Sequence, residues 1–333
     1  MPQVGERVSE GPLIVGLGEA MLRLGPSNQV PLLDASTFEV HVGGTELNVL
    51  IAASALGARA RWLTRLPRSP LGEIIRRHAL SRGVTVVSHD EPGARAGLFF
   101  LESGVPPRPS RVLYDRLDSA ASHMVADEFD WAHELDGASA AHVTGITCAL
   151  GDGPAAAASA LLTAARTAGV MTSFDVNYRS QLWDVPSALA SFHTVLPLVD
   201  TLFVSPGDLA MLRGRVDDSA TLVDEIIQEF GTSTVVLRES QQVSTLERSV
   251  QVQVFGDTSG SAQASGTVVD ELGAGDAAAA AFLVSMVSDE SSDVSARRCA
   301  RACARMLTIP GDSWTGGLFD LDDGYTTASN VQR

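Results

Sequence analysis

An alternation of apolar strands and helices, from residue 140 to residue 238, constrains the fold more than any other feature of the sequence. The pattern predicts, in chain order, strand 140–144, helix 154–168, strand 171–176, strand 200–204, helix 207–213, helix 218–230 and strand 233–238. Strands separated by helices form a parallel sheet with helices on both faces. We therefore expect an α/β fold built on a doubly wound, mainly parallel sheet.

The first part of the chain is richer in strands. The apolar run Leu13–Leu17 is typical of a buried strand, and it is followed by predicted helix 45–56, strand 59–64 and helix 71–82. Other strand-like pieces do not belong to the alternating part; they lie at 21–24, 38–42, 96–101 and 111–116. These pieces predict a small separate sheet formed from about 21–42 and 96–116. We expect one domain over residues 1–333, because no linker or repeat interrupts the chain.

Charge and composition restrict the partners. The formal net charge is −16, which disfavours nucleic acid and anionic membranes. The 24 Lys and Arg residues are all Arg, which excludes a catalytic lysine. No apolar run is long enough to cross a bilayer, and segment 1–12 has no signal-peptide core, so we expect a cytoplasmic protein. Cys148, Cys299 and Cys303 lack metal-ligand spacing, and Cys299 and Cys303, one helical turn apart, are expected to be packed thiols.

A glycine-rich loop, Asp270–Asp276 (DELGAGD), leads directly into the alanine-rich segment 277–281. Gly273 and Gly275 allow a tight turn whose N–H groups face a ligand, and a helix starting at Asp276 adds the positive end of its dipole. The loop is therefore suited to bind an anion. A carboxylate at Asp276 beside that anion is suited to remove a proton from an attacking hydroxyl. The alternative is a glycine-rich turn in which Asp276 only caps the helix.

Further polar residues lie where ligands bind in sheets of this kind. Gly43–Gly44 stands between a strand and a helix, so its backbone can approach a small ligand closely. Asn48, one turn into that helix, is placed to reach a hydroxyl, or else is a surface amide. Asn177 follows an apolar strand, at the end where open α/β sheets bind ligands. Arg179 can bind a phosphate or carboxylate through two N–H groups, or can lie free on the surface.

Five ordered segments resemble motifs of the ribokinase-like (PfkB-type) carbohydrate kinases. They are Gly43–Asn48 with Ala52, Ala53, Leu56 and Gly57; Thr64–Pro67 with Pro70–Gly72 and Gly83–Val84; Thr144–Ile146; Phe174–Arg179 with Leu182–Trp183; and Gly273–Asp276. The segments occur in family order with family-like spacing, from about Ile14 to Asp312. Any one of them is weakly specific, but the ordered set indicates the ribokinase-like fold, in which the small sheet forms a lid over the site.

The resemblance implies a kinase that transfers the γ-phosphoryl group of ATP, with Mg²⁺, to a sugar hydroxyl. It implies Asp276 as the base, with the amides of Gly273, Ala274 and Gly275 neutralising charge and Arg179 orienting the anionic partner. The implied substrate-binding residues are Gly43, Gly44, Asn48, Phe99, Tyr114, Arg116 and Asn177. The implied nucleotide-binding residues are Ser205, Arg238, Glu239, Gly273 and Gly275, and the implied metal ligand is Asp208.

The lid segment favours one branch of the family. Tyr114 and Arg116 flank Asp115, similar to the Tyr-Tyr-Arg of the 2-keto-3-deoxygluconate kinases. Alternation along a strand places Tyr114 and Arg116 on one face, where a guanidinium suits the carboxylate of an acid sugar. Phe99 stands where that branch often has Tyr. We therefore expect 2-keto-3-deoxygluconate as the substrate, with a neutral sugar or a nucleoside as the alternative.

The nucleotide side departs from the family pattern. Glu271 and Leu272 replace two threonines, and Ser205–Asp208 is a shortened form of an Asn-x-x-Glu motif. The segment Glu239–Val243 lacks the usual glycine, and Ala278 and Ala281 replace Phe and Gly. These changes leave a second hypothesis open: a catalytically weak member that binds a sugar acid or nucleotide as a regulator.

The lid also suggests an oligomer. Val40, Leu98, Phe100 and Val112 fall at alternate positions and are expected to form an apolar face on a sheet too thin to bury it. The resembled family often pairs lids, so we expect a homodimer through the lid. The alternative is a monomer whose lid folds down on its own domain.

Overall fold

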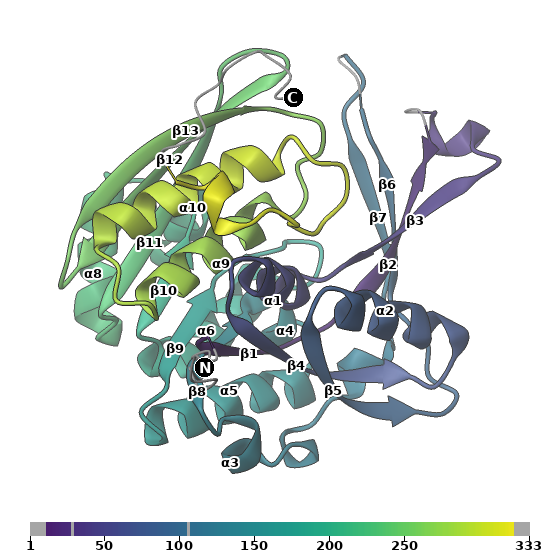
Figure 1. Ribbon diagram of the computed structural model, residues 1–333, viewed down its shortest axis with the longest axis horizontal. Helices are drawn as coiled ribbons and strands as arrows, with labels where there is room; N and C mark the ends of the chain where they lie inside the picture. The colour runs from purple at the N-terminus through teal and green to yellow at the C-terminus, as the bar shows by residue number, and fades with distance from the viewer. Residues whose placement is uncertain (1–10, 28–29, 105–106, 323–333) are drawn as a thin grey trace, which may run out of the picture.

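The computed structural model describes residues 11–27, 30–104 and 107–322. Residues 1–10, most of the N-terminal segment considered above, lie outside this description. The described chain forms a large sheet covered by helices on both faces, from which a smaller sheet projects at one edge (Figure 1). No helix in the described ranges is both long and apolar enough to cross a membrane.

The large sheet has nine strands, and seven of them are parallel. In spatial order the parallel strands are β11 (Thr234–Gln242), β10 (Thr201–Val204), β9 (Met171–Asp175), β8 (Ala138–Thr144), β1 (Leu13–Leu17), β4 (Arg59–Pro67) and β5 (Val84–Glu91). At the β11 edge, β12 (Glu247–Gly256) and β13 (Gly260–Thr267) continue the sheet in antiparallel pairs. The doubly wound, mainly parallel sheet is confirmed.

Helices cover both faces and bury two separate cores. One core packs under α1 (Thr45–Ala55), α2 (Pro70–Ser81), α9 (Ala274–Met286) and α10 (Ser292–Met306). The other packs under α5 (Asp152–Thr167), α6 (Val185–Val195), α7 (Pro206–Arg213) and α8 (Ser219–Phe230). Two short helices, α3 (Trp131–Glu134) and α4 (Gly145–Cys148), lie in connections. Cys148, Cys299 and Cys303 are buried free thiols, as expected for Cys299 and Cys303.

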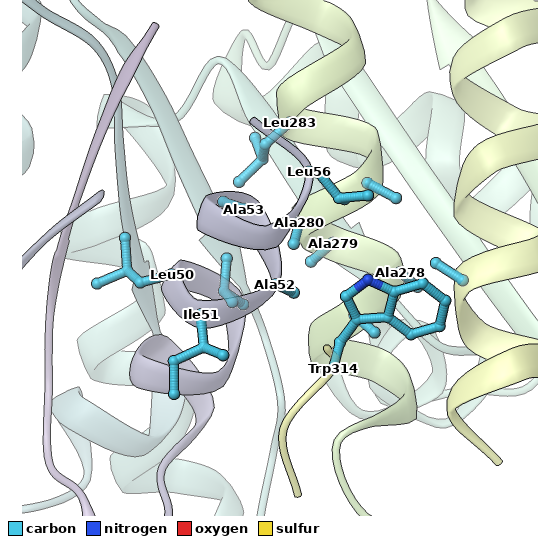
Figure 2. Packing of buried hydrophobic residues seen from close by; sticks show 14 of the residues in the cluster. Leu50, Ile51, Ala52, Ala53, Leu56, Ala278, Ala279, Ala280, Leu283 and Trp314 are labelled. Atoms are coloured by element: carbon cyan, nitrogen blue, oxygen red, sulfur yellow. The ribbon is translucent and has the colours of Figure 1, made fainter. Parts of the chain in front are cut away.

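Small residues let α1 and α9 pack closely, and this contact positions the site. Ala52 and Ala53 of α1 and Ala279 and Ala280 of α9 are fully buried, and the Trp314 ring packs beside them (Figure 2). α9 itself carries buried, mostly apolar residues on every side, which is the pattern of a helix in the interior of a domain. The first turn of α9 is therefore held rigidly beside α1.

The smaller sheet has the strand order β3 (Phe38–Gly43), β2 (Met21–Pro26), β6 (Leu98–Glu102) and β7 (Arg111–Asp115). The register corrects the predicted apolar face at one position. Leu24 pairs with both Val40 and Phe100, and Phe100 pairs with Leu113, so these four residues share the outer face. Val112 pairs with Leu101, so it lies on the opposite face and lines the cavity described below. Val112 is one residue from Leu113, and neighbouring residues of a strand point to opposite faces.

Candidate active site

The carboxyl ends of the parallel strands, the first turns of α1 and α9 and the inner face of the smaller sheet enclose a cavity of about 320 Å³. Distant segments bring most of the predicted site residues to its wall. Those in the lining are Gly43, Gly44, Asn48, Phe99, Tyr114, Arg116, Asn177, Arg179, Ser205, Asp208, Arg238, Gly273, Gly275 and Asp276. Glu239 and Ala274 are outside the lining, and Ala274 is buried as the first residue of α9.

The glycine-rich loop turns into α9 two residues earlier than predicted. The helix begins at Ala274, and Gly273 is its N-cap with φ +74°. That left-handed backbone suits glycine, and a Cβ at Gly273 would lie 2.1 Å from the carbonyl oxygen of Asp312. Asp276 is therefore the third residue of the helix. The N–H groups of the first turn have no partners within the helix, so they can bind an anion.

Asp276 is half-buried and is held by α1. Its Oδ2 accepts a hydrogen bond of 2.7 Å from Nδ2 of Asn48. Loss of solvent raises the pKa of Asp276 to about 7, and the neighbouring carboxylate of Asp175 adds to the rise. The bond from Asn48 and the charges of Arg238 and Arg179 lower the same pKa. A carboxyl that titrates near neutral pH is suited to accept a proton.

Arg238 is bound within the protein, although the sequence predicted it to bind a nucleotide. One terminal nitrogen donates to Oδ2 of Asp175 and the other donates to the carbonyl oxygen of Gly275. The guanidinium also lies over the ring of Phe203, 5.3 Å from its centre. The ion pair with Asp175 raises the pKa of Arg238 despite burial. Arg238 therefore connects two walls of the cavity.

Tyr114 and Arg116 both line the cavity, although β7 ends at Asp115 and Arg116 directly follows it. Nη2 of Arg116 forms a buried ion pair with Glu19, which neutralises its charge. The guanidinium lies 5.8 Å from the centre of the Tyr114 ring, and Nε has no partner in the described chain. Glu19 also accepts a hydrogen bond from Ser119, so this end of the cavity is a fixed polar cluster.

Ser205 and Asp208 form the start of α7. Oδ2 of Asp208 accepts from the backbone N–H of Ser205 at 2.9 Å and from its hydroxyl at 2.6 Å, while the hydroxyl of Ser205 accepts from the N–H of Asp208. This reciprocal arrangement is a capping box. Burial raises the pKa of Asp208. Asp208 thus has a structural role at the cavity wall, as the partner of Ser205 in this cap.

Asp312 is a cavity residue that the sequence patterns did not single out. Its Oδ1 accepts 2.9 Å from Nη1 of Arg23, and its buried Oδ2 has no partner in the described chain. A Cβ at Gly43 would lie 2.7 Å from that Oδ2, so the carboxyl reaches the part of the cavity lined by Gly43. Burial raises the pKa of Asp312 to about 6. The pair spans 289 residues, so only the fold shows it.

Glu271, the residue that replaces a family threonine, is held by Arg248 of β12. Its Oε1 accepts from both Nε, at 3.1 Å, and Nη2 of Arg248. The Glu271 side chain is 58% exposed. The ion pair compensates its charge at the edge of the anion site, which explains how a carboxylate is tolerated there.

Carboxylates outnumber guanidiniums in the cavity wall, by six to three. They are Glu19, Asp175, Asp208, Glu271, Asp276 and Asp312 against Arg116, Arg179 and Arg238. Arg116 and Arg238 are already paired with carboxylates, whereas the side chain of Arg179 has no hydrogen-bond or ion-pair partner in the described ranges. A phosphate chain entering this cavity is therefore favoured when it carries cations of its own.

The chain is similar to known carbohydrate kinases. The model of the pfkB family carbohydrate kinases matches residues 12–309. A 2-dehydro-3-deoxygalactonokinase from Haloferax volcanii is 33% identical over 301 residues, covering 90% of this chain and 92% of that protein. A 2-dehydro-3-deoxygluconokinase from Thermoproteus tenax is 34% identical over 230 residues, covering 68% of each chain.

Solved structures share the fold. The 2-dehydro-3-deoxygluconokinase from Thermotoga maritima matches with a TM-score of 0.87 at 30% identity, covering 93% of this chain and 97% of that chain. A putative ribokinase II from E. coli, solved with ATP and Mg²⁺, matches with a TM-score of 0.79 at 17% identity, covering 93% and 97%. The family match over residues 12–309, on a chain with this fold, shows that the protein is a sugar kinase and belongs to the pfkB family of carbohydrate kinases.

Proposed function

We propose that this kinase phosphorylates a 2-keto-3-deoxy sugar acid, with 2-keto-3-deoxygluconate (2-dehydro-3-deoxygluconate) as the preferred substrate. The observation that carries the catalytic part is the placement of Asp276. Its carboxyl, with a pKa of about 7, stands in the first turn of a helix whose N–H groups can bind an anion. A proton acceptor and a phosphate site therefore lie side by side.

In the proposed reaction, Asp276 accepts the proton of the attacking sugar hydroxyl. The hydroxyl oxygen forms the new bond to the γ-phosphorus as the bond from that phosphorus to the bridging oxygen breaks and leaves ADP. Amides of the Gly273–Gly275 loop stabilise the charge of the transferred group, and Arg179 orients it. The buried, unpaired Oδ1 of Asn48 is placed to accept from a sugar hydroxyl.

ATP and Mg²⁺ are the proposed donor and metal. Bound Mg²⁺–ATP supplies the phosphoryl group and compensates its negative charge, which the acidic cavity wall favours. Asp208 is the carboxylate proposed for the metal side, with Ser205 beside it. In the part of the chain that the structure describes, no group of three His, Cys, Asp or Glu side chains forms a ready metal site, so we expect Mg²⁺ to enter with the nucleotide.

Two observations support an acid substrate. Tyr114 and Arg116 form a polar end of the cavity, and the unpaired Nε of Arg116 leaves a donor for a carboxylate. Several relatives are named as kinases of 2-dehydro-3-deoxy sugar acids, including those from Haloferax volcanii and Thermoproteus tenax. Neutral sugars would leave that donor unused.

The test is a comparison of kcat/KM, from ADP release with Mg²⁺–ATP, for 2-keto-3-deoxygluconate, its galactonate epimer, ribose, fructose and adenosine. We expect the acids to be preferred, and Arg116→Ala to cost about 1.5–3 kcal/mol for an acid and little for a neutral sugar. Because the change leaves Glu19 unpaired, the double variant Arg116→Ala/Glu19→Gln is the control. A preference for a neutral substrate would contradict the proposal.

A regulatory binder with little turnover is the second candidate. The observation that favours it lies on the nucleotide side, where Arg238 is bound by Asp175 and Gly275 and Glu239 is outside the cavity. Calorimetric binding of a sugar acid without ADP release in the same samples would support this candidate over the kinase.

We further propose a homodimer that forms through the lids. Phe38, Val40 and Leu113 on the outer face are 40%, 54% and 57% exposed, and the rings of Phe38 and Phe100 are in edge-to-face contact. An apolar face of this kind on a four-stranded sheet favours an interface. A second lid of the same kind is the proposed partner.

A further inference from the structure

Arg238 connects two elements of the cavity wall, the end of β9 and the first turn of α9. It stands in β11 with its side chain 15% exposed, and its guanidinium is fixed by Asp175, by Gly275 and by the ring of Phe203. Asp175 ends β9, whereas Gly275 is in the first turn of α9. These two elements carry the sugar-side turn and the anion-binding turn, respectively.

On the sugar side, the contact with Asp175 controls a strained turn. Oδ1 of Asp175 accepts a 3.2 Å hydrogen bond from the N–H of Asn177, whose φ is +40°. A non-glycine residue in this left-handed region is held there by its surroundings, although Asn tolerates it better than most. The turn then delivers Arg179 to the cavity. An Asp175 side chain anchored by Arg238 therefore fixes both residues.

On the phosphate side, Arg238 donates a hydrogen bond to the carbonyl oxygen of Gly275, the residue before Asp276. A Cβ at Gly275 would lie 3.2 Å from Nη1 of Arg238, so glycine leaves the room for this contact. Because the carbonyl of Gly275 is held, the position of the first turn of α9 relative to β11 is held as well. That turn contains Asp276 and the free N–H groups.

The same guanidinium balances the charges around the base. The groups that face Asp276 are Asp175 from β9, Arg179 from the turn after β9, Arg238 from β11, Asn48 from α1 and Cys303 from α10. Without Arg238, the neighbouring carboxyl groups of Asp175 and Asp276 would lose a shared cation. The pKa of Asp276 would then rise, because its charged form would be less favourable.

We propose that Arg238 is a positioning residue of the kinase, which aligns the sugar-side turn with the anion-binding turn and does not bind the nucleotide. This inference rests on the proposed phosphoryl transfer. If the two turns shift by about 1 Å relative to each other, turnover is expected to fall by up to about 100-fold. The effect is expected in kcat, with smaller changes in the KM values for ATP and for the sugar.

The variants are Arg238→Met and Arg238→Lys, with Arg298→Met as the matched control. Arg298, on α10 and away from the cavity, is similarly buried, at 13% exposure, and is paired with Glu290 and Asp322. We expect kcat to fall in Arg238→Met, to recover in part in Arg238→Lys, and to stay unchanged in Arg298→Met. The acid limb of the kcat profile should move to higher pH only in the Arg238 variants.

A readout independent of turnover separates this inference from the proposed function. The side-chain ¹³C signal of Asp276, titrated with pH, should give a higher pKa in Arg238→Met than in the wild type. If the wild type has no kinase activity but this shift appears, the positioning role stands and the proposed function fails. If Arg238→Met does not fold, as judged by circular dichroism, Arg238→Lys carries the same titration.

Two results would overturn the inference. The first is a raised KM for ATP with an unchanged kcat, which would make Arg238 a nucleotide-binding residue. The second is an unshifted Asp276 titration together with a kcat loss equal to the loss of folded protein, which would make its role only structural.

Discussion

The carboxyl of Asp276 and the amide of Asn48 come from positions 228 residues apart, and their contact decides how the base points. The sequence predicted Asp276 and the glycine loop because the motif is local: glycines, an acid and a helix start within seven residues. The sequence also predicted that Asn48 contacts the sugar, but it did not predict the hydrogen bond between Asn48 and Asp276. Ion pairs such as Arg23 with Asp312 and Arg116 with Glu19 depend on chain topology, which residue spacing does not report.

Asp276→Asn should abolish phosphoryl transfer and leave sugar binding within a few-fold. The amide keeps the shape of the side chain and can still hydrogen-bond Asn48, but it cannot accept the proton, a loss typically of about 10²–10⁴-fold. The measurement is kcat for ADP release beside calorimetric binding of the sugar. Turnover retained by the variant, with the wild type active, would rule out Asp276 as the base.

The pH dependence follows from the raised pKa of Asp276. Only the carboxylate accepts a proton, so activity should be present above a pKa of about 7 and should fall as pH drops through it. An unperturbed aspartate would place the fall near pH 4. A kcat profile from pH 5 to 9 distinguishes the two, and a flat profile down to pH 5 would contradict the burial argument.

At the scale of elements, the regular part of the chain was the most predictable. Strands 140–144 and 171–176 and helix 218–230 match β8, β9 and α8 to within two residues. The sequence patterns did not predict β5, α6, β12 or β13 as separate elements. β5 and β12 mix exposed polar residues with apolar ones, and α6 is rich in Ser, Thr and Val, which weakens a helical pattern.

Gly273→Ala should disrupt the start of α9. The change combines an unfavourable φ of +74° with a Cβ placed 2.1 Å from the carbonyl oxygen of Asp312. Gly169→Ala is the matched control, since its φ is +71° and no atom lies within 4 Å of the added Cβ.

Strain of the backbone alone costs about 1–3 kcal/mol, so both variants should lose stability, and Gly273→Ala should lose more. Only Gly273→Ala should also lower kcat, because only this turn carries the anion-binding amides. Urea unfolding gives the stabilities. Equal losses in the two variants, with full activity in both, would show that the close approach of Gly273 to Asp312 is unimportant.

At the scale of the whole molecule, the outer face of the lid leaves Phe38, Val40 and Leu113 exposed among the residues that the structure describes. If two lids pack together, Phe100→Asp should place a charge in the interface and dissociate the dimer. Val216→Asp is the control, because Val216 is 90% exposed in the connection between α7 and α8, away from the lid. Sedimentation at micromolar concentration should show a dimer for the wild type and for Val216→Asp, and a monomer for Phe100→Asp.

Activity should follow the association state, because the inner face of the same lid supplies Phe99, Val112 and Tyr114 to the cavity. A lid freed from its partner is expected to close less often, which raises the KM for the sugar more than it lowers kcat. A wild type that sediments as a monomer with full activity would end the lid-dimer proposal and favour a lid that closes on its own domain.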